Sequence, residues 1–460
     1  MKITEAVKVV NGLLKNSNCD LEVSLNDIST DSRQMKPGQI FIPLVGVDYD
    51  GHDFIEEAFK KGASIAFVNE KWWGKNHKCP LRIIVVRDTL KALQALAQYH
   101  RCNFEIPVIA VTGSNGKTTT KDMIAAILKQ KLDVVKSHAS YNNEIGLPLT
   151  LLQITNKTQA VVVEMGMRGM NQIEELATIS QPTIGVITNI APVHLELLGT
   201  IENIVQAKGE LVRKISKSGK VLLNGEDNRC REMASWSEAT SLFYGFNTEN
   251  KFRAENIETS FESSTYLLRI CEEEIEISLP IPGLHNILNS LAAAGVAFEL
   301  GFNLKDIQKG LKDCSLSEMR LEISENSKGV VIINDAYNAN PVSMMASIDV
   351  LASALGKRKI AILGAMHELG EFEKEGHLLV GEHIYRSNID ILVAVGEKAA
   401  LIALGAKRAG MGDEKIFLFD KKINAAMFLK EYIVEGDCVL LKASRAAKLD
   451  EIVEKISGER

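Results

Sequence analysis

The sequence predicts an α/β protein of three domains built largely on parallel sheets. Short, nearly continuous apolar runs alternate with amphipathic stretches of helical spacing along most of the 460 residues. That alternation is typical of buried parallel strands joined by helices. A chain of this length has room for about three domains of ordinary size. With 46% hydrophobic and 24% charged residues, it has the composition of a globular protein with packed cores.

The charge and apolar patterning exclude several classes of protein. The net charge of -6 favours neither nucleic acid nor an anionic membrane surface as a partner. The first residues, MKITEAVKVVNGLL, are amphipathic and unlike a signal peptide, and no stretch approaches the roughly 20 apolar residues of a membrane span. Seven dispersed cysteines without a CxxC pair indicate buried thiols in a reducing compartment. We therefore expect a cytoplasmic protein.

Residues 1–99 are predicted to form a small α/β domain. Its expected strands are the apolar runs at 39–45, 63–68 and 82–86, and the stretch 52–62 has helical spacing.

Residues 100–316 are predicted to form a central domain on a mostly parallel sheet. Its expected strands lie at 106–113, 132–137, 160–166, 184–190 and 220–226. After residue 250 the pattern changes, because 266–283 alternates apolar and polar residues as an antiparallel appendage does. Helical patterns at 285–301 and 304–313 close the domain.

Residues 317–460 are predicted to form a doubly wound, Rossmann-like domain. Five apolar runs separated by helical patterns lie at 329–335, 359–366, 390–396, 415–420 and 438–444. Ligands are expected where the carboxyl ends of such strands meet at domain junctions.

The stretch VIAVTGSNGKTTT (108–120) predicts a phosphate-binding loop between a strand and a helix. Gly113 and Gly116 are separated by two residues, where the common nucleotide loop has four. Lys117 would contact the β- and γ-phosphates, and Thr118 would contact Mg²⁺. A glycine-rich turn that merely caps a helix is the alternative, which the preceding strand and the Gly-Lys-Thr triplet disfavour. The predicted nucleotide-contacting residues of the loop are Gly113, Ser114, Asn115, Gly116, Lys117, Thr118 and Thr119.

Two polar residues follow neighbouring apolar runs of the central domain. Glu164 ends the run at 160–164 and His194 follows the run at 184–190, so both are candidates for a cation site beside the loop. Taken singly, Glu164 is equally well a strand-end surface acid, and His194 a hydrogen-bonded structural histidine. Their joint placement favours the functional interpretation.

The stretch NDAYNANP (334–341) follows an apolar run of the third domain. Asp335 could accept hydrogen bonds from ribose hydroxyls, Asn338 and Asn340 offer amide donors and acceptors, and Pro341 can begin a helix. An asparagine-rich turn with an aspartate cap is an equally good interpretation of this stretch alone. Three further residues, each weak by itself, are Asn286, Asn289 and Arg320.

Taken together, the motifs resemble those of the Mur ligase family. The shared stretches, in family order, are TGSNGKTTT, SYNNEIGLPLTLL, EMGMRG, NIAPVHLE, AKGEL, HNILNSLAA, MRLE, DAYNANP and LLKASR. The N-terminal TDSRQMKPGQIFIPLVG and DGHDFI resemble that family's nucleotide-sugar binding domain.

The resemblance implies ATP-dependent amide formation in peptidoglycan precursor synthesis. The variant it resembles most adds D-alanyl-D-alanine to UDP-N-acetylmuramoyl-tripeptide through an acyl phosphate. The expected ligands are these small molecules, ATP and two divalent ions such as Mg²⁺, with no nucleic acid partner, and we expect a monomer. A Mur-like amino-acid or polyglutamate ligase with another acceptor, and a P-loop phosphotransferase or NTPase switch, remain alternatives.

The resemblance also implies residue roles. Thr118 and Glu164 would hold one Mg²⁺, and His194 and a carbamylated Lys208 a second cation; from the residues alone, Lys208 is an ordinary exposed helix lysine. The implied catalytic residues are Lys117, His194, Lys208 and Arg320. The implied adenine, ribose and phosphate contacts are Asn286, Asn289, Arg320, Asp335 and Asn340. The implied contacts to the uridine-muramoyl substrate are Ser32, Arg33, Asn142 and Asn143, and those bordering the dipeptide are Lys442, Ser444 and Arg445.

Two stretches depart from the family pattern. In LGAMHELG, Ala365 and His367 stand where the family more often has Gly-Asp-Met before Glu-Leu-Gly, so a carboxylate is lost. In LLKASR, Ala443 replaces a usual glycine, which matters if the position needs a positive φ. The loop and Asp335 belong to different predicted domains, so we also expect ATP to close the third domain onto the second.

Overall fold

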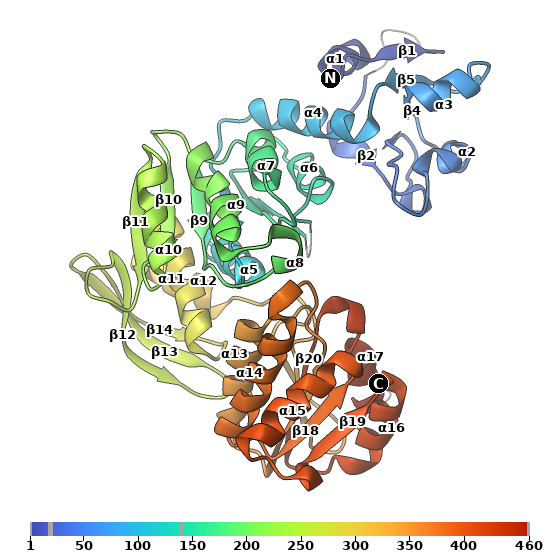
Figure 1. Ribbon diagram of the computed structural model, residues 1–460. Helices are drawn as coiled ribbons and strands as arrows, with labels where there is room; N and C mark the ends of the chain where they lie inside the picture. The colour runs from blue at the N-terminus through green and yellow to red at the C-terminus, as the bar shows by residue number, and fades with distance from the viewer. Residues whose placement is uncertain (1, 17–21, 139–140, 458–460) are drawn as a thin grey trace.

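The computed structural model describes residues 2–16, 22–138 and 141–457, which form three lobes, each built around its own sheet (Figure 1). The lobes follow one another along the chain, with the central lobe between the N-terminal and C-terminal ones. The predicted α/β class with mostly parallel sheets is confirmed. The domain limits after residues 99 and 316 stay predictions.

The N-terminal lobe contains a five-stranded sheet in which β1 pairs antiparallel with β5 and the remaining neighbours pair parallel. Its strands, in spatial order, are β1 (Leu13–Lys15), β5 (Ile83–Val86), β4 (Ile65–Asn69), β3 (Ile40–Phe41) and β2 (Ile28–Ser29). Its helices are α1 (Ile3–Val9), α2 (Ile55–Lys60), α3 (Glu70–Lys75) and α4 (Thr89–Cys102). The sequence did not predict β1 and β2, because two or three residues are too few to show a periodic pattern.

The central lobe contains a nine-stranded sheet that is parallel from β7 to β12 and antiparallel beyond. Its strands, in spatial order, are β14 (Glu273–Leu279), β13 (Ser264–Ile270), β12 (Phe252–Thr259), β11 (Thr240–Gly245), β10 (Lys220–Asn224), β9 (Ile184–Ile187), β6 (Val108–Thr112), β8 (Ala160–Glu164) and β7 (Val134–Lys136). Its helices are α5 (Lys117–Leu128), α6 (Gly146–Leu151), α7 (Gln172–Ser180), α8 (Leu195–Leu198), α9 (Ile201–Lys214), α10 (Asn228–Glu232), α11 (Leu284–Glu299) and α12 (Leu304–Lys312). The stretch 266–283, predicted to be antiparallel, covers β14 and most of β13, whereas β11 and β12 were not predicted.

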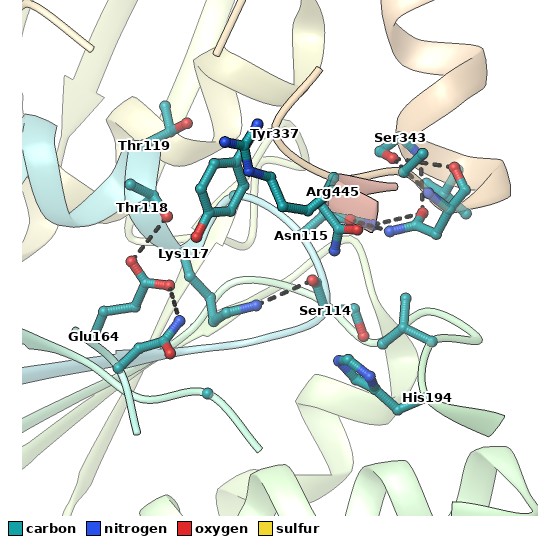
Figure 2. A pocket seen from close by; sticks show the side chains of 18 of the residues that line it. Ser114, Asn115, Lys117, Thr118, Thr119, Glu164, His194, Tyr337, Ser343 and Arg445 are labelled. Carbon is teal, nitrogen blue, oxygen red and sulfur yellow. Dashed lines mark hydrogen bonds between the residues drawn. The ribbon is translucent and has the colours of Figure 1, made fainter. Parts of the chain in front are cut away.

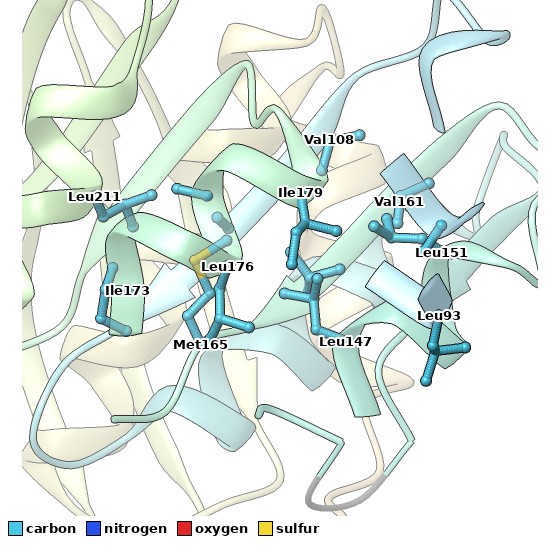
Figure 3. Close-up of a cluster of buried hydrophobic side chains, with 14 of the residues drawn as sticks. Leu93, Val108, Leu147, Leu151, Val161, Met165, Ile173, Leu176, Ile179 and Leu211 are labelled. Carbon is cyan, nitrogen blue, oxygen red and sulfur yellow. The ribbon is translucent and has the colours of Figure 1, made fainter. Parts of the chain in front are cut away.

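Alternate residues of the central strands enter different cores. Val108 of β6 lies in a cluster with side chains of α4, α6, α7 and α9, some of which Figure 3 shows, whereas Ile109 packs with α5 and α11 on the other face. The first cluster also contains Phe67 of the N-terminal sheet and Leu93 of α4. The N-terminal lobe therefore shares a buried apolar core with one face of the central sheet.

The C-terminal lobe is a doubly wound sheet with helices on both faces. Its strands, in spatial order, are β15 (Glu322–Glu325), β16 (Val331–Asn334), β20 (Asp437–Lys442), β17 (Arg358–Gly364), β18 (Ile391–Val395) and β19 (Ile416–Phe419). Its helices are α13 (Pro341–Ala352), α14 (Glu373–Arg386), α15 (Ala400–Ala409), α16 (Lys422–Tyr432) and α17 (Asp450–Ile456). The five predicted strands are present, and the antiparallel edge strand β15 was missed because all four of its residues are exposed.

Cysteine burial differs from the sequence prediction. Cys19 lies outside the described residues, and the other six are unpaired. Cys102 and Cys271 are exposed, so the expectation of buried thiols is wrong for them. Within the described residues, no helix combines the length and apolarity that a bilayer crossing requires.

The shared core predicts a stability effect at the junction of the first two lobes. We expect Leu93→Ala, at a fully buried position, to lower the free energy of unfolding by about 2–5 kcal/mol, because it removes apolar contacts and leaves a cavity. Urea unfolding followed by circular dichroism measures this effect. Leu355→Ala, at a fully exposed position, is the control and should change it by less than about 0.5 kcal/mol. Equal stability of the two variants would contradict the shared core.

Candidate active site

A cavity of about 780 Å³ lies between the central and C-terminal lobes, where the carboxyl ends of strands from both sheets meet (Figure 2). It brings together most residues that the sequence singled out, although they are spread over more than 300 positions. The predicted site residues that line it are Ser114, Asn115, Gly116, Lys117, Thr118, Thr119, Asn142, Asn143, Glu164, His194, Lys208, Asn286, Asn289, Arg320, Asp335, Asn340, Lys442, Ser444 and Arg445.

The loop between β6 and α5 depends on glycine at two positions. Gly113 has a φ of +147°, and a Cβ there would lie 1.8 Å from the hydroxyl oxygen of Thr188. Gly116 has a left-handed φ of +78° at the start of α5, and its Cβ would lie 2.3 Å from Oδ1 of Asn289. Side chains are excluded at both positions by backbone conformation and by space.

Residues that follow β9 support the loop through hydrogen bonds. Thr188 donates its hydroxyl to the carbonyl of Asn115 at 2.6 Å, and Asn189 accepts the N–H of Asn115 at 3.0 Å. The Ser114 hydroxyl donates to the carbonyl of Ala191 and accepts that residue's N–H. These bonds hold the loop in one shape at the amino end of α5, where a helix presents partial positive charge to anions.

Lys117 folds back over the loop that precedes it. Its ammonium donates to the carbonyls of Gly113 at 3.0 Å and Ser114 at 3.2 Å. Burial lowers the pKa of Lys117, and the nearby Glu164 carboxylate partly opposes that effect. The ammonium is therefore held directly at the anion-binding face of the loop.

Glu164 and Thr118 meet as the sequence interpretation requires. The Thr118 hydroxyl donates to Oε2 of Glu164 at 2.8 Å, and the amide of Asn142 donates to Oε1 at 2.9 Å. Glu164 is buried at the end of β8, which lies directly beside β6. It is therefore not a surface acid, and one of its carboxylate oxygens faces Thr118 at the start of α5 (Figure 2).

Lys121 is a buried cation at this site that the sequence interpretation missed. It lies one helical turn after Lys117, and its side chain is fully buried. Its ammonium lies 3.5 Å from Asp122 Oδ1 and 4.0 Å from Glu164 Oε2, yet it has no hydrogen-bond partner among the described residues. Burial lowers the pKa of Lys121, against the opposing effect of Asp122. Its position in a helix after the loop gave no signal in the sequence.

Lys208 is buried, so the interpretation of an exposed helix lysine is wrong. It lies on α9 with 2% of its surface exposed, and its amine donates to the carbonyl of Gly113 at 2.9 Å. Burial holds the pKa of Lys208 well below its ordinary value, and the charge of Lys117 lowers it further.

His194 lies at the start of α8 and contacts the C-terminal lobe. Its Nδ1–H donates to the carboxylate of Glu368, a residue the sequence interpretation did not assign. Burial lowers the pKa of His194, and Glu368 opposes this effect. Glu368 is the remaining acid of LGAMHELG, the stretch in which a family carboxylate is absent.

Three residues of the C-terminal side either contact the loop and the start of α5 or support a residue that makes such a contact. The amides of Asn115 and Asn340 bond reciprocally, at 2.6 and 3.4 Å. Arg320 donates to the Thr118 hydroxyl at 3.3 Å and stacks on Tyr337, with 4.0 Å between its guanidinium carbon and the ring centroid. Tyr337 lies within NDAYNANP and was also unassigned.

Asp335 and Lys442, predicted to contact different ligands, form one buried ion pair. Asp335 also accepts hydrogen bonds from the Ser347 hydroxyl at 2.6 Å and the Leu321 N–H at 3.2 Å. Burial lowers the pKa of Lys442, against the opposing effect of Asp335. The pair therefore sits on the C-terminal wall of the cavity, beside Asn340.

The remaining predicted residues divide between the cavity wall and other places. Asn289 accepts the hydroxyl proton of Thr120 and donates to Asn286, so these amides form part of the wall beside the loop. Ser444 accepts the His367 N–H at 2.9 Å, and Arg445 pairs with Asp450. Ala443 does not have a left-handed φ, so its methyl group is tolerated without backbone strain.

The structure does not bring Ser32 and Arg33 to this cavity. Both lie in the N-terminal lobe, where the Ser32 hydroxyl donates to Glu57 and the exposed Arg33 pairs with Asp31. Their predicted contact with a nucleotide-sugar substrate stays a prediction.

The chain matches three Mur ligase domains in succession. Residues 25–101 match the "Mur ligase family, catalytic domain", residues 111–297 the "Mur ligase middle domain", and residues 319–445 the "Mur ligase, glutamate ligase domain".

Named relatives are similar over the whole length. The UDP-N-acetylmuramoyl-tripeptide–D-alanyl-D-alanine ligase of Bacillus subtilis (strain 168) is 36% identical over 99% of this chain and 98% of its own. The ligase of the same name from Escherichia coli (strain K12) is 30% identical over 99% and 98%.

Solved structures share the fold. A crystal structure of MurF from Acinetobacter baumannii matches with a TM-score of 0.90 and 28% identity over 100% of this chain and 99% of that one. The MurF ligase of Thermotoga maritima in complex with ADP matches with a TM-score of 0.82 and 28% identity over 95% and 98%. On the matched domains and the full-length relatives, the chain belongs to the Mur ligase family.

Proposed function

We propose that this protein is an ATP-dependent ligase that joins D-alanyl-D-alanine to UDP-N-acetylmuramoyl-tripeptide. The products are the UDP-muramoyl-pentapeptide, ADP and phosphate. The names of the full-length relatives support these two substrates, and the ADP in the Thermotoga maritima structure supports nucleotide binding.

The observation that carries the proposal is that one cavity combines a phosphate loop with groups from a second domain. Asn115 of the loop bonds to Asn340, and Arg320 donates to Thr118. A simple NTPase switch needs no such second wall, whereas a ligase must hold ATP, a carboxylate and an amine together.

Lys117 and the N–H groups at the start of α5 would hold the phosphates, with Arg320 facing them. Asn286, Asn289, Asp335 and Asn340 would contact adenine and ribose. With the γ-phosphate fixed there, an oxygen of the tripeptide's terminal carboxylate attacks its phosphorus atom. The bond to the bridging oxygen breaks, ADP leaves with that electron pair, and the carboxylate becomes an acyl phosphate.

The second step forms the amide bond. The dipeptide amine attacks the activated carbonyl carbon, the amine loses a proton, and phosphate leaves with the electrons of its C–O bond. An α-amine pKa of about 7.7–8.0 leaves part of this nucleophile neutral near pH 7, so a strong general base is not required. Positioning and charge neutralisation by the cationic side chains of the cavity therefore supply most of the catalysis.

The residues at the loop fit a Mg²⁺ ion. Thr118 and Glu164 offer a hydroxyl and a carboxylate 2.8 Å apart, both of which are hard oxygen donors. Among the described residues, no three His, Cys, Asp or Glu side chains gather as a metal site, so phosphate oxygens and waters would complete the coordination. When bound, Mg²⁺ neutralises charge on the phosphate oxygens.

His194 and Lys208 would hold a second divalent ion if Lys208 is carbamylated. Carbamylation joins the amine nitrogen to CO₂ with loss of a proton, and it requires the uncharged amine. The buried environment that lowers the pKa of Lys208 favours that form. The resulting carbamate offers anionic oxygens, whereas a bare ammonium would repel a cation.

The three domains would divide the substrates among them. Residues 1–99 would bind the uridine-muramoyl part through Ser32 and Arg33, with Asn142 and Asn143 at the edge of the central domain. Residues 100–316 would bind ATP, and residues 317–460 would bind the dipeptide near Lys442, Ser444 and Arg445 and complete the ATP site.

The acceptor specificity is tested by ADP release. We expect rapid release with UDP-muramoyl-tripeptide and D-alanyl-D-alanine together, and little with either alone, because the acyl phosphate needs the amine to turn over. Glutamate in place of the dipeptide is the control. Turnover that ignores the dipeptide, or is equal with glutamate, would reject the specific assignment.

The carbamate is tested by chemical rescue. Lys208→Ala should be inactive, and acetate or propionate should restore part of the activity by placing a carboxylate in the vacated space. Lys217→Ala, at an exposed position, is the matched control and should keep full activity. Unchanged activity of Lys208→Ala would remove the carbamate from the mechanism.

The bond between the two walls is tested by a double-mutant cycle. Asn115→Ala and Asn340→Ala should each lower kcat/KM for ATP, and their coupling energy should be about 0.5–1.5 kcal/mol, the net value of a hydrogen bond. Asn303 caps helix α12 outside the cavity, so Asn303→Ala is the control. Its effect should be additive with that of Asn115→Ala. Strict additivity of Asn115→Ala with Asn340→Ala would show that the pair does not act together.

A further inference from the structure

The loop after β17 extends Glu368 from the C-terminal lobe across the interface to the central lobe. Its carboxylate accepts the Nδ1–H of His194 and lies 3.7 Å from the guanidinium of Arg168. Its backbone carbonyl accepts the N–H of Glu196 at 3.4 Å. One residue of the third lobe is thus joined to three residues of the second.

The two partners of the central contact have unusual backbone conformations. His194 has a φ of +57° and Glu368 a φ of +63°, both in the left-handed region that side chains other than glycine rarely adopt. Strained conformations of this kind persist where the surrounding structure enforces them, and they gather at functional sites. Here the strain occurs on both sides of one hydrogen bond.

The hydrogen bond determines which nitrogen of His194 is available. A carboxylate can only accept, so the proton lies on Nδ1 and the lone pair on Nε2. Within the described part of the chain, Nε2 makes no hydrogen bond. The imidazole lines the cavity with Lys208 and Ser114 (Figure 2). A histidine held at one nitrogen by a carboxylate is the arrangement that metal-ligating histidines adopt.

We propose that Glu368 is a positioning residue, supplied by the C-terminal lobe, that orients His194 toward the second divalent ion. The inference rests on the proposed assignment of that ion to His194 and Lys208. It follows that this cation site is complete only when the C-terminal lobe contacts the central one. By linkage, the factor by which closure strengthens binding of the ion equals the factor by which the bound ion shifts the equilibrium toward the closed arrangement.

The first test measures metal binding rather than turnover. Mn²⁺ is titrated into the full-length chain with saturating ADP, and bound Mn²⁺ is counted by electron paramagnetic resonance. Glu368→Gln keeps the shape of the side chain but weakens the acceptor, and we expect its second Mn²⁺ to bind about 10- to 100-fold more weakly. Glu371→Gln changes an exposed carboxylate of the same loop and should bind both ions as the unchanged chain does.

The outcomes separate this inference from the proposed function. If Glu368→Gln binds the second Mn²⁺ with unchanged affinity, the inference is wrong. If the unchanged chain binds a single Mn²⁺, the cation at His194 and the role of Glu368 are both rejected, while ADP release decides the ligase assignment independently.

A second measurement needs no variant, so it holds even if Glu368→Gln does not fold. Small-angle scattering of the unchanged chain with ADP should show compaction that follows occupancy of the second Mn²⁺. Compaction that is complete at one Mn²⁺ per chain would overturn the coupling between closure and this ion.

Discussion

The close packing of the loop at 113–116 is the constraint on which the nucleotide site depends. The loop is pressed between Thr188, which follows β9, and Asn289 of α11, and no side chain fits at Gly113 or Gly116. This packing places the start of α5 at the cavity wall, with Lys117 bonded to the loop carbonyls of Gly113 and Ser114. Two residues between the glycines are sufficient, because neighbouring segments hold the loop in shape. A longer loop would have to hold its shape through its own residues.

The cavity is richer in buried cations than in anions near the loop. Lys117 and Lys208 line the cavity and Lys121 is buried beside it, and burial lowers the pKa of each. Glu164 and Asp122 are the carboxylates whose charges oppose this effect on Lys117 and Lys121. Buried charge without a partner is costly, so a site of this kind is stabilised by a polyanion. A nucleoside triphosphate is such a ligand.

The central lobe is joined to its two neighbours by different forces. The N-terminal lobe shares an apolar core with it through α4, whereas the C-terminal lobe meets it through polar contacts such as Asn115–Asn340, Thr118–Arg320 and His194–Glu368. Apolar cores resist separation, but hydrogen bonds at an interface can be exchanged for water. Motion of the C-terminal lobe is therefore the conformational change that this architecture favours, and it would open and close the ATP site.

The sequence by itself determined the α/β class, most central and C-terminal strands, and the strand–loop–helix unit beside which Glu164 lies, whereas the phosphate-binding role of its residues stays a prediction. These features depend on local apolar runs and on residue types at short spacing, which a sequence displays directly. It missed β15, whose exposed residues show no apolar pattern, and it favoured an exposed Lys208, because burial is a property of neighbours. Only the tertiary structure decided that Lys121 is buried beside Asp122, that Asp335 pairs with Lys442, and that Glu368 meets His194. Each of these depends on a contact between charged groups that packing brings together, and no spacing along the chain encodes it.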